Sequence, residues 1–193
     1  GWTVVQLIPE LAPGGAERST MEVARALVAA HHRSIVICGG GRWVTRLKAE
    51  GSEHIKLPIG SKSLGLLSAW LKLRKHLRKL HPDVVHARSR LPAWLLRFAL
   101  IGIHPRPKVV TTVHGLNSVS AYSRIMTWGD RVIAVSRATA DFLLEHYPGL
   151  DTTRVRIIPR GADPAEFPPR LKVTPEWCRT FGDEYPGLKG GRL

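Results

Sequence analysis

A pair of glycines, Gly14 and Gly15, stands where a short β-branched run passes into a helical pattern. Because these residues lack a Cβ, a ligand can approach the backbone closely. The amides that begin the following helix are unpaired donors at its positive end, so a phosphate or a sugar hydroxyl could bind there. The alternative is that the pair only makes a tight turn, since it matches neither a dinucleotide fingerprint nor a Walker loop.

Two arginines follow a later run of the same kind. Arg88 and Arg90 come directly after the run 84–86, and Ser89 lies between them. Open α/β proteins bind ligands at the carboxyl ends of their strands, and two guanidinium groups there could form forked hydrogen bonds with phosphate or carboxylate. The alternative is that both side chains are simply solvated.

A histidine and a serine also follow apolar runs. His114 comes after the run 108–113, at a strand end that would face the same crevice as the two glycines. A lone histidine is usually a core or surface residue, so its position matters more than its type. Ser136 begins a helical pattern after the run 131–135 and repeats, more weakly, the anion-site geometry of the first turn.

The elements that must position these residues alternate along the chain. Short apolar runs predict strands at 3–8, 34–38, 53–57, 84–86, 108–113, 131–135 and 155–158. Helical periodicity fills most of the gaps, which favours right-handed βαβ units. We therefore predict an α/β fold with a Rossmann-like, doubly wound parallel sheet of about six to seven strands and helices on both faces. All the candidate residues above would then lie along one rim of the sheet.

Composition narrows the functional class. The 193 residues carry a formal charge of +14, which calls for an anionic partner such as nucleic acid, phospholipid headgroups or a phosphorylated substrate. Two cysteines in unrelated contexts favour a reducing, cytoplasmic setting. No apolar run is long enough to span a membrane, and no His, Cys or carboxylate cluster has metal-ligand spacing.

The segment 63–80 is strongly basic and contains no acidic residue. Leucines line one side of the expected helix, and a tryptophan lies near the apolar border, which is typical of a helix at an anionic membrane surface. The alternative is an ordinary sheet-covering helix with a solvated basic face. The predicted membrane-contacting residues are Trp70, Lys72, Arg74, Lys75, Arg78 and Lys79.

Five motifs stand in a fixed order, and together they resemble a known family. They are Gly-Gly-Ala-Glu at 14–17, Asp-Val-Val-His-Ala-Arg at 83–88, Thr-Val-His-Gly at 112–115, Val-Ile-Ala-Val-Ser at 132–136, and Ile-Pro-Arg-Gly-Ala-Asp with a following Phe at 158–167. The series resembles the N-terminal domain of family 4 retaining glycosyltransferases, which have the two-domain GT-B architecture. It looks most like bacterial enzymes that build lipopolysaccharide core or other envelope glycans.

This resemblance implies roles for the matching positions. Gly14 and Gly15 would face the donor diphosphate and the acceptor across the cleft. His114 would lie near the transferred sugar, where its backbone carbonyl stabilises developing positive charge or its ring holds a hydroxyl. The implied acceptor-binding residues are Glu17, Arg88 and Arg90. At 160–163 the family more usually has Asn-Gly-Val-Asp, and Arg160 and Ala162 depart from that pattern.

The resemblance covers about residues 3–168, so we expect an N-terminal, acceptor-side domain at 1–168 and an interdomain linker or tail at 169–193. We expect the family's second domain, which holds the nucleotide, to be missing from this chain, so the chain alone should turn over little substrate. The implied partners are a nucleotide-sugar donor, a glycan or glycolipid acceptor, an anionic membrane surface and the missing domain. No metal or cofactor is expected, and the implied location is the inner face of the cytoplasmic membrane.

The rival hypothesis is a basic binding module for nucleic acid or anionic surfaces without catalysis, which the net charge motivates. The aromatic and glycine-rich signatures of RNA-reading domains are missing, however. The basic residues also concentrate on a helix with a long apolar side. We therefore expect no nucleic-acid partner.

Overall fold

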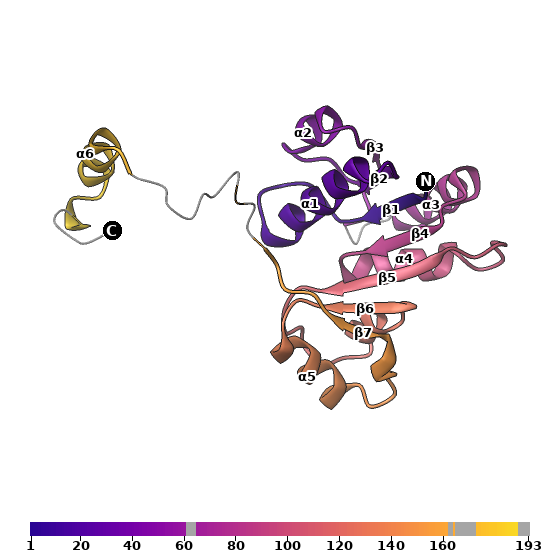
Figure 1. The fold of residues 1–193 in the computed structure, drawn as a ribbon. Coiled ribbons are helices and arrows are strands. Elements are labelled where there is room, and N and C mark those ends of the chain that lie inside the picture. Colours follow the sequence, from indigo (N-terminus) through magenta and orange to yellow (C-terminus); the bar gives the residue numbers. More distant parts are fainter. Residues whose placement is uncertain (61–64, 162–163, 165–172, 189–193) are drawn as a thin grey trace. The chain divides into compact units, whose positions relative to one another are not determined.

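Seven parallel strands form one sheet in the computed structural model of the chain, which describes residues 1–60, 65–161, 164 and 173–188 (Figure 1). The order across the sheet is β3-β2-β1-β4-β5-β6-β7. The strands are β1 (Thr3–Leu7), β2 (Arg33–Cys38), β3 (Glu53–Lys56), β4 (Val84–Ala87), β5 (Lys108–Val113), β6 (Arg131–Ala134) and β7 (Val155–Ile157). The chain winds outward from β1 to one edge and then from β4 to the other, which is the doubly wound topology predicted above.

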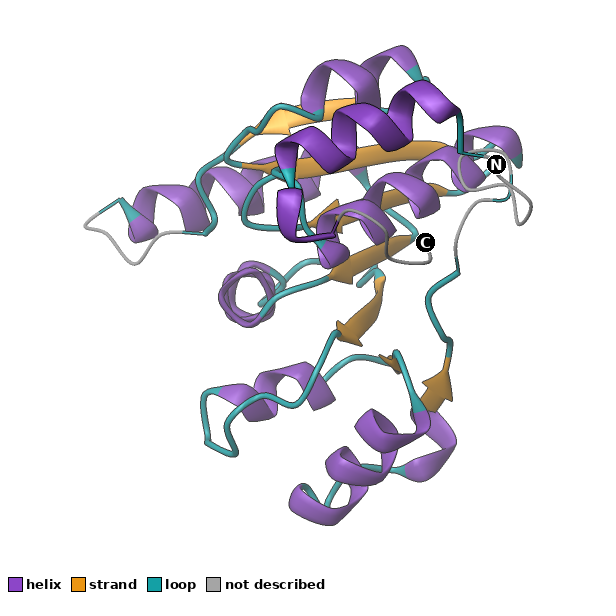
Figure 2. Cartoon of the chain, turned by 90° about the vertical axis from the view of Figure 1, so that its left-hand side faces the viewer, coloured by secondary structure: helices purple, strands orange, loops and turns teal. Residues whose placement is uncertain are grey.

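Helices connect the strands and cover both faces of the sheet (Figure 2). The elements are α1 (Gly15–Ala29), α2 (Val44–Ala49), α3 (Leu66–Leu80), α4 (Arg90–Ala99), the 3₁₀ segment η1 (Ser123–Thr127), α5 (Arg137–His146), the 3₁₀ segment η2 (Thr152–Arg154), α6 (Pro175–Glu184) and the 3₁₀ segment η3 (Pro186–Leu188). Right-handed crossovers place α1 and α2 on one face, and α3, α4 and α5 on the other.

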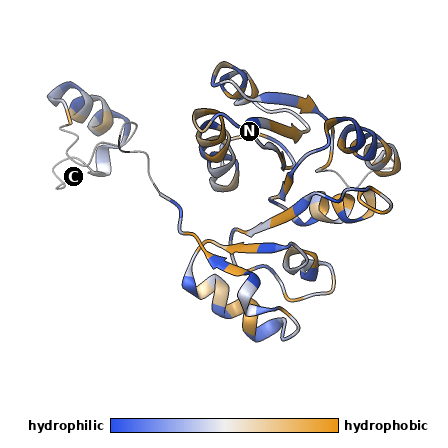
Figure 3. Ribbon diagram, turned by 45° about the vertical axis from the view of Figure 1, so that its right-hand side comes forward, coloured by the Kyte–Doolittle hydropathy of each residue, from blue (hydrophilic) through white to orange (hydrophobic). Residues whose placement is uncertain are grey.

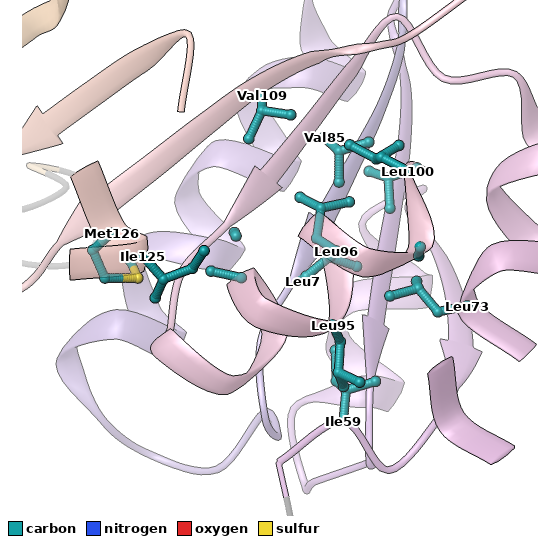
Figure 4. Close-up of a cluster of buried hydrophobic side chains, with 14 of the residues drawn as sticks. Leu7, Ile59, Leu73, Val85, Leu95, Leu96, Leu100, Val109, Ile125 and Met126 are labelled. Carbon is teal, nitrogen blue, oxygen red and sulfur yellow. The ribbon is translucent and has the colours of Figure 1, made fainter. Parts of the chain in front are cut away.

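Two apolar clusters hold these layers together. The larger lies between the sheet and α3, α4, η1 and α5, where Leu7, Leu73 and Leu96 are fully buried (Figure 4). The smaller lies beneath α1 and α2 and includes Met21 and Leu47. Because β1 and β2 are covered on both sides, every residue of each strand after the first is buried. The hydropathy colouring shows polar and apolar residues alternating along the helices that flank the sheet (Figure 3).

The predicted strands are all present to within a residue or two at each end. One connection differs from the α-helices that link the other strands: the segment between β5 and β6 contains the 3₁₀ turn η1. Its start is fixed by the amide of Ser123, which donates to Oγ of Ser120 at 3.1 Å. The turn η1 is five residues long, a length typical of 3₁₀ segments, which seldom extend further because their hydrogen-bond geometry is poorer than that of an α-helix.

The chain divides into two compact units, residues 1–159 and 160–193. The second contains α6, although no regular element was expected in 169–193. A signal for this helix was present, because Thr174 caps it by accepting from the amide of Trp177 at 3.1 Å, and Pro175 occupies its first turn. The proposed domain boundary at 168 remains a prediction.

Candidate functional site

A cavity of about 220 Å³ opens at the carboxyl edge of the sheet. It is built from the turn after β1 with the first turn of α1, from the segments after β4 and β5, and from η1. Its lining residues are Ile8, Pro9, Ala16, Glu17, Arg88, Ser89, Arg90, Thr112, His114, Gly115, Asn117 and Met126. Four of the predicted site residues, Glu17, Arg88, Arg90 and His114, therefore lie around one cavity.

Arg88 is held at the inner wall of this cavity and is only 3% exposed. Its Nε donates to Oε1 of Gln6 at 2.8 Å, and its Nη1 donates to Oγ of Ser19 at 3.2 Å. The Gln6 amide is fixed in turn because its Nε2 donates to the carbonyl of Thr20 at 3.2 Å. These contacts orient a positive charge where little water screens it, so the wall favours an anionic group on a ligand. Simple solvation of Arg88 is thereby excluded.

Arg90 approaches the cavity from the first residue of α4. Its Nη1 donates to Oγ of Ser123 at 3.2 Å, and its guanidinium carbon lies 5.4 Å from the centre of the Tyr122 ring. The backbone of Tyr122 is pinned by Nε1 of Trp94, which donates to its carbonyl oxygen at 3.0 Å. The 3₁₀ turn thus sets the direction of the Arg90 side chain, and it does so from a distant part of the sequence.

A buried histidine supports the cavity from behind. Nε2 of His86, on β4, lies 2.7 Å from Oγ1 of Thr112 on β5, and the Thr112 side chain also lines the cavity. Burial lowers the pKa of His86 well below its ordinary value, and the positive charges of Arg88 and His114 lower this pKa further. Sequence reasoning missed both residues. A signal existed, because residues two apart on a strand share a face and His86 precedes Arg88 by two.

We expect the stability of the fold to fall as the pH drops below about 6.5, the ordinary histidine pKa. The unfolded chain then binds a proton that folded His86 resists, so the free energy of unfolding falls by up to about 1.4 kcal/mol per pH unit for this group. Burial is also the main cause that lowers the pKa of His54, so this residue too makes the free energy of unfolding fall as the pH drops. Denaturant unfolding at neutral and mildly acidic pH measures the slope. The variant His86→Gln should flatten it, whereas an unchanged slope would exclude His86 as its main source.

The glycine pair lies beside the cavity and not in its lining. Gly14 is the N-cap of α1 and Gly15 is its first residue. A Cβ at Gly14 would lie 2.3 Å from Oε2 of Glu17, so the missing side chain makes room for that carboxylate. Glu17 therefore lies against the positive end of α1, where a phosphate was predicted. A ligand anion at this helix start would have to displace the Glu17 carboxylate.

Ser136 lies at the same edge of the sheet, directly after β6, but serves the fold. Its Oγ accepts a hydrogen bond from the amide of Thr139 at 3.1 Å and lies 2.9 Å from Oγ1 of the same residue. It is the N-cap of α5 and is not among the residues that line the cavity. Its predicted contact with phosphate remains a prediction.

The six residues of the basic helix α3 that were predicted to contact a membrane fall into two groups: two pack against the rest of the fold, and four are exposed. Trp70 packs against the larger apolar cluster. Arg74 reaches the end of α4, where its Nη1 donates to the carbonyl of Ala99 at 2.8 Å and also to that of Ile101. These two side chains help to hold α3 against the fold. The four exposed basic residues are Lys72, Lys75, Arg78 and Lys79.

An all-parallel doubly wound sheet with a polar cavity at the carboxyl ends of its central strands defines a Rossmann-like ligand-binding domain. The sequence model of Glycosyltransferase Family 4 matches residues 13–166, and the chain belongs to this family. No curated protein matches the chain significantly. Over the residues that the structure describes, no helix is long and apolar enough to cross a membrane, and no three His, Cys, Asp or Glu side chains are grouped to hold a metal ion.

Several solved structures share the fold. A glycosyltransferase from Rickettsia africae ESF-5 is 34% identical, with a TM-score of 0.77, and the match covers 96% of this chain and 49% of that one. HepE from Anabaena, in complex with UDP-glucose, is 17% identical with a TM-score of 0.74, and the match covers 98% of this chain and 51% of that one. WaaG, a glycosyltransferase involved in lipopolysaccharide biosynthesis, is 15% identical with a TM-score of 0.65, and the match covers 98% of this chain and 52% of that one. The chain thus spans about half the length of these relatives and corresponds to the N-terminal half of a GT-B glycosyltransferase.

Proposed function

We propose that this chain is the acceptor-side half of a retaining glycosyltransferase, which transfers a sugar from a nucleotide-sugar donor to a bacterial envelope glycan or glycolipid. The observation that carries the proposal is the single cavity around which Glu17, Arg88, Arg90 and His114 gather, in a member of Glycosyltransferase Family 4. HepE binds UDP-glucose and WaaG acts in lipopolysaccharide biosynthesis, which are the donor and acceptor classes proposed here.

Each residue around the cavity has a proposed role. His114 holds a hydroxyl of the transferred sugar with its ring, or stabilises developing positive charge with its carbonyl oxygen. Arg88 and Arg90 bind an anionic group of the acceptor, such as a phosphate or a carboxylate. Hydroxyl groups of the acceptor substrate donate hydrogen bonds to the Glu17 carboxylate, because an ionised carboxylate can only accept hydrogen bonds. The donor diphosphate approaches the backbone at Gly14, at the start of α1, once the Glu17 carboxylate has moved away from this helix end.

The direct test joins this chain to the remaining half of the Rickettsia africae glycosyltransferase, of which it covers 49%. Transfer of labelled sugar from UDP-glucose or another nucleotide sugar to envelope glycolipid is then measured, together with the anomeric configuration of the product. Transfer with retention is expected, and a chelator should not abolish it. A fused protein that folds but transfers no sugar from a panel of donors would contradict the proposal. Saturable, sequence-selective binding to nucleic acid would instead favour the rival binding module.

We further propose that α3 rests on an anionic membrane surface, on the inner face of the cytoplasmic membrane. Leu67 is 65% exposed and Leu71 is 52% exposed, and together they leave two large apolar side chains uncovered near the start of the helix. The exposed cations of α3 follow toward its end. Apolar side chains that insert and cations that attract anionic headgroups are the two terms of interfacial binding.

The triple variant Lys72→Gln, Lys75→Gln, Lys79→Gln should bind acidic vesicles about 100-fold more weakly, because each basic residue near the surface contributes about 1 kcal/mol. Vesicle sedimentation at low salt measures the change. The matched control removes three exposed basic residues elsewhere, with Arg42→Gln, Lys48→Gln and Lys56→Gln, and should change binding much less. Equal losses in the two triple variants would show that net charge alone drives adsorption.

A further inference from the structure

A second hollow lies at the opposite edge of the sheet, at the amino ends of β5 and β6. Its volume is about 680 Å³, and four basic side chains line it against one carboxylate. The basic residues are Arg106, Lys108, Arg131 and Arg154. In Figure 1 this edge is at the tails of the β5 and β6 arrows, whereas the candidate functional site is at their heads. The two edges are about 20 Å apart along the six residues of β5.

The cations gather there because of the topology. Lys108 is the first residue of β5, Arg131 is the first residue of β6, and Arg154 directly precedes β7. These strands are parallel neighbours, so their amino ends meet at one edge. A basic residue at the start of each strand therefore produces one cluster of positive charge from three distant parts of the sequence.

A pinned turn shapes the floor of the hollow. Oδ2 of Asp130 accepts a hydrogen bond from the amide of Val109 at 2.7 Å, and Nη2 of Arg154 donates to the carbonyl of Thr127 at 2.9 Å. A Cβ at Gly129 would lie 2.7 Å from the carbonyl oxygen of Arg131, so the backbone of this turn is closely packed. The cations are thus attached to a fixed frame, which lowers the cost of ordering them around a ligand.

The single carboxylate is already engaged. Its second oxygen, Oδ1 of Asp130, pairs with Arg106 at 3.4 Å. Nη1 of Arg131 donates to the backbone carbonyl of Asp130 at 2.9 Å, a contact that orients the guanidinium without neutralising it. The Lys108 ammonium makes no hydrogen bond or ion pair with any residue that the structure describes. Positive charge therefore exceeds negative charge in the hollow, and a bound anion would relieve the repulsion.

The aromatic wall indicates what kind of anion fits. Trp128 already carries two guanidinium groups against its ring, with Arg97 at 5.3 Å and Arg106 at 5.4 Å from the ring centre. The ring therefore orients cations and is not offered as a stacking surface for a ligand base. Guanidinium groups suit the tetrahedral oxygens of phosphate, which can accept two hydrogen bonds from each fork.

We infer that this hollow is a second anion site, which binds a phosphate or diphosphate group independently of the candidate functional site. The group belongs either to a free phosphorylated metabolite or to a lipid headgroup. Both sources present the same oxygens to Lys108 and Arg131.

The test titrates inorganic pyrophosphate into the chain by calorimetry at about 50 mM salt, where surface charges are only partly screened. Saturable binding with a Kd of about 1 mM or tighter is expected. The double variant Lys108→Gln, Arg131→Gln should weaken it at least about tenfold. The control double variant Arg42→Gln, Lys48→Gln removes two exposed charges elsewhere and should change the Kd less than about twofold. Thermal unfolding verifies that each variant is folded, and Lys108→Gln alone serves if the double variant is not.

Three results would overturn the site. The first is no saturable binding of pyrophosphate to the wild-type chain, and the second is an equal loss of binding in the two double variants. The third is a loss of binding in Arg90→Gln while the Lys108→Gln, Arg131→Gln variant still binds. The last result would assign the anion to the cavity at the carboxyl edge of the sheet.

A second experiment uses phosphatidylglycerol vesicles to identify the source of the anion. If the Lys108→Gln, Arg131→Gln variant adsorbs more weakly and pyrophosphate competes with the vesicles, the site takes a lipid headgroup. If vesicle binding is unchanged while pyrophosphate binding is lost, the site takes a free anion.

Discussion

Replacing His114 with alanine lowers kcat for sugar transfer by about 100-fold to 1,000-fold, which is the expected result when this chain is joined to a nucleotide-binding half. The ring lines the same cavity as Arg88 and Thr112, where a sugar would lie. A group that interacts with the reacting sugar mainly in the transition state contributes effects of this size. Because the interaction is made in the transition state, kcat and kcat/KM should fall together.

The matched control for His114 is His146→Ala, at the end of α5 and away from the cavity. This variant should keep kcat within about twofold, since surface substitutions rarely alter a distant site. Steady-state kinetics with saturating donor and varied acceptor separates kcat from KM. Wild-type rates in His114→Ala would show that the ring takes no part in transfer, and the proposed role of the side chain would then be abandoned.

Replacing Arg88 with methionine should cause two losses. The free energy of unfolding falls by about 1 to 3 kcal/mol, because Oε1 of the fully buried Gln6 loses its 2.8 Å donor. The value of kcat/KM for an anionic acceptor also falls about 100-fold, because a charge-assisted contact at the cavity wall is removed. Chemical denaturation measures the first loss, and acceptor kinetics measures the second.

The charge-matched control is Arg124→Met, which removes an exposed arginine from η1. It should leave both quantities nearly unchanged. The variant Arg88→Lys keeps the charge but not the geometry of the fork, so it should restore acceptor binding only in part. A normal KM for the acceptor in a folded Arg88→Met protein would mean that the guanidinium only supports the wall and does not contact the substrate.

Local patterns in the sequence determined most of the fold. Buried strands such as 34–38 are continuous apolar runs, and helices between them follow a 3.6-residue period, so each element is specified by its own residues. The alternation of the two kinds then leaves few topologies for a parallel sheet. Because the carboxyl ends of such strands share an edge, the sequence also placed Arg88, Arg90 and His114 at one rim.

What each side chain does at that rim depended on the tertiary structure. Arg88 and Gln6 are 82 positions apart, and only the pairing of β1 with β4 brings them into contact. In the same way, the pairing of β4 with β5 brings His86 within hydrogen-bond distance of Thr112. The packing of α3 against α4 lets Arg74 donate a hydrogen bond to the carbonyl of Ala99 at the end of α4. Periodicity reports which face of an element is apolar, but a hydrogen-bond partner is set by which elements become neighbours. For this protein the sequence alone therefore determined the elements and the rim, whereas long-range packing decided which residues line the cavity and which support it.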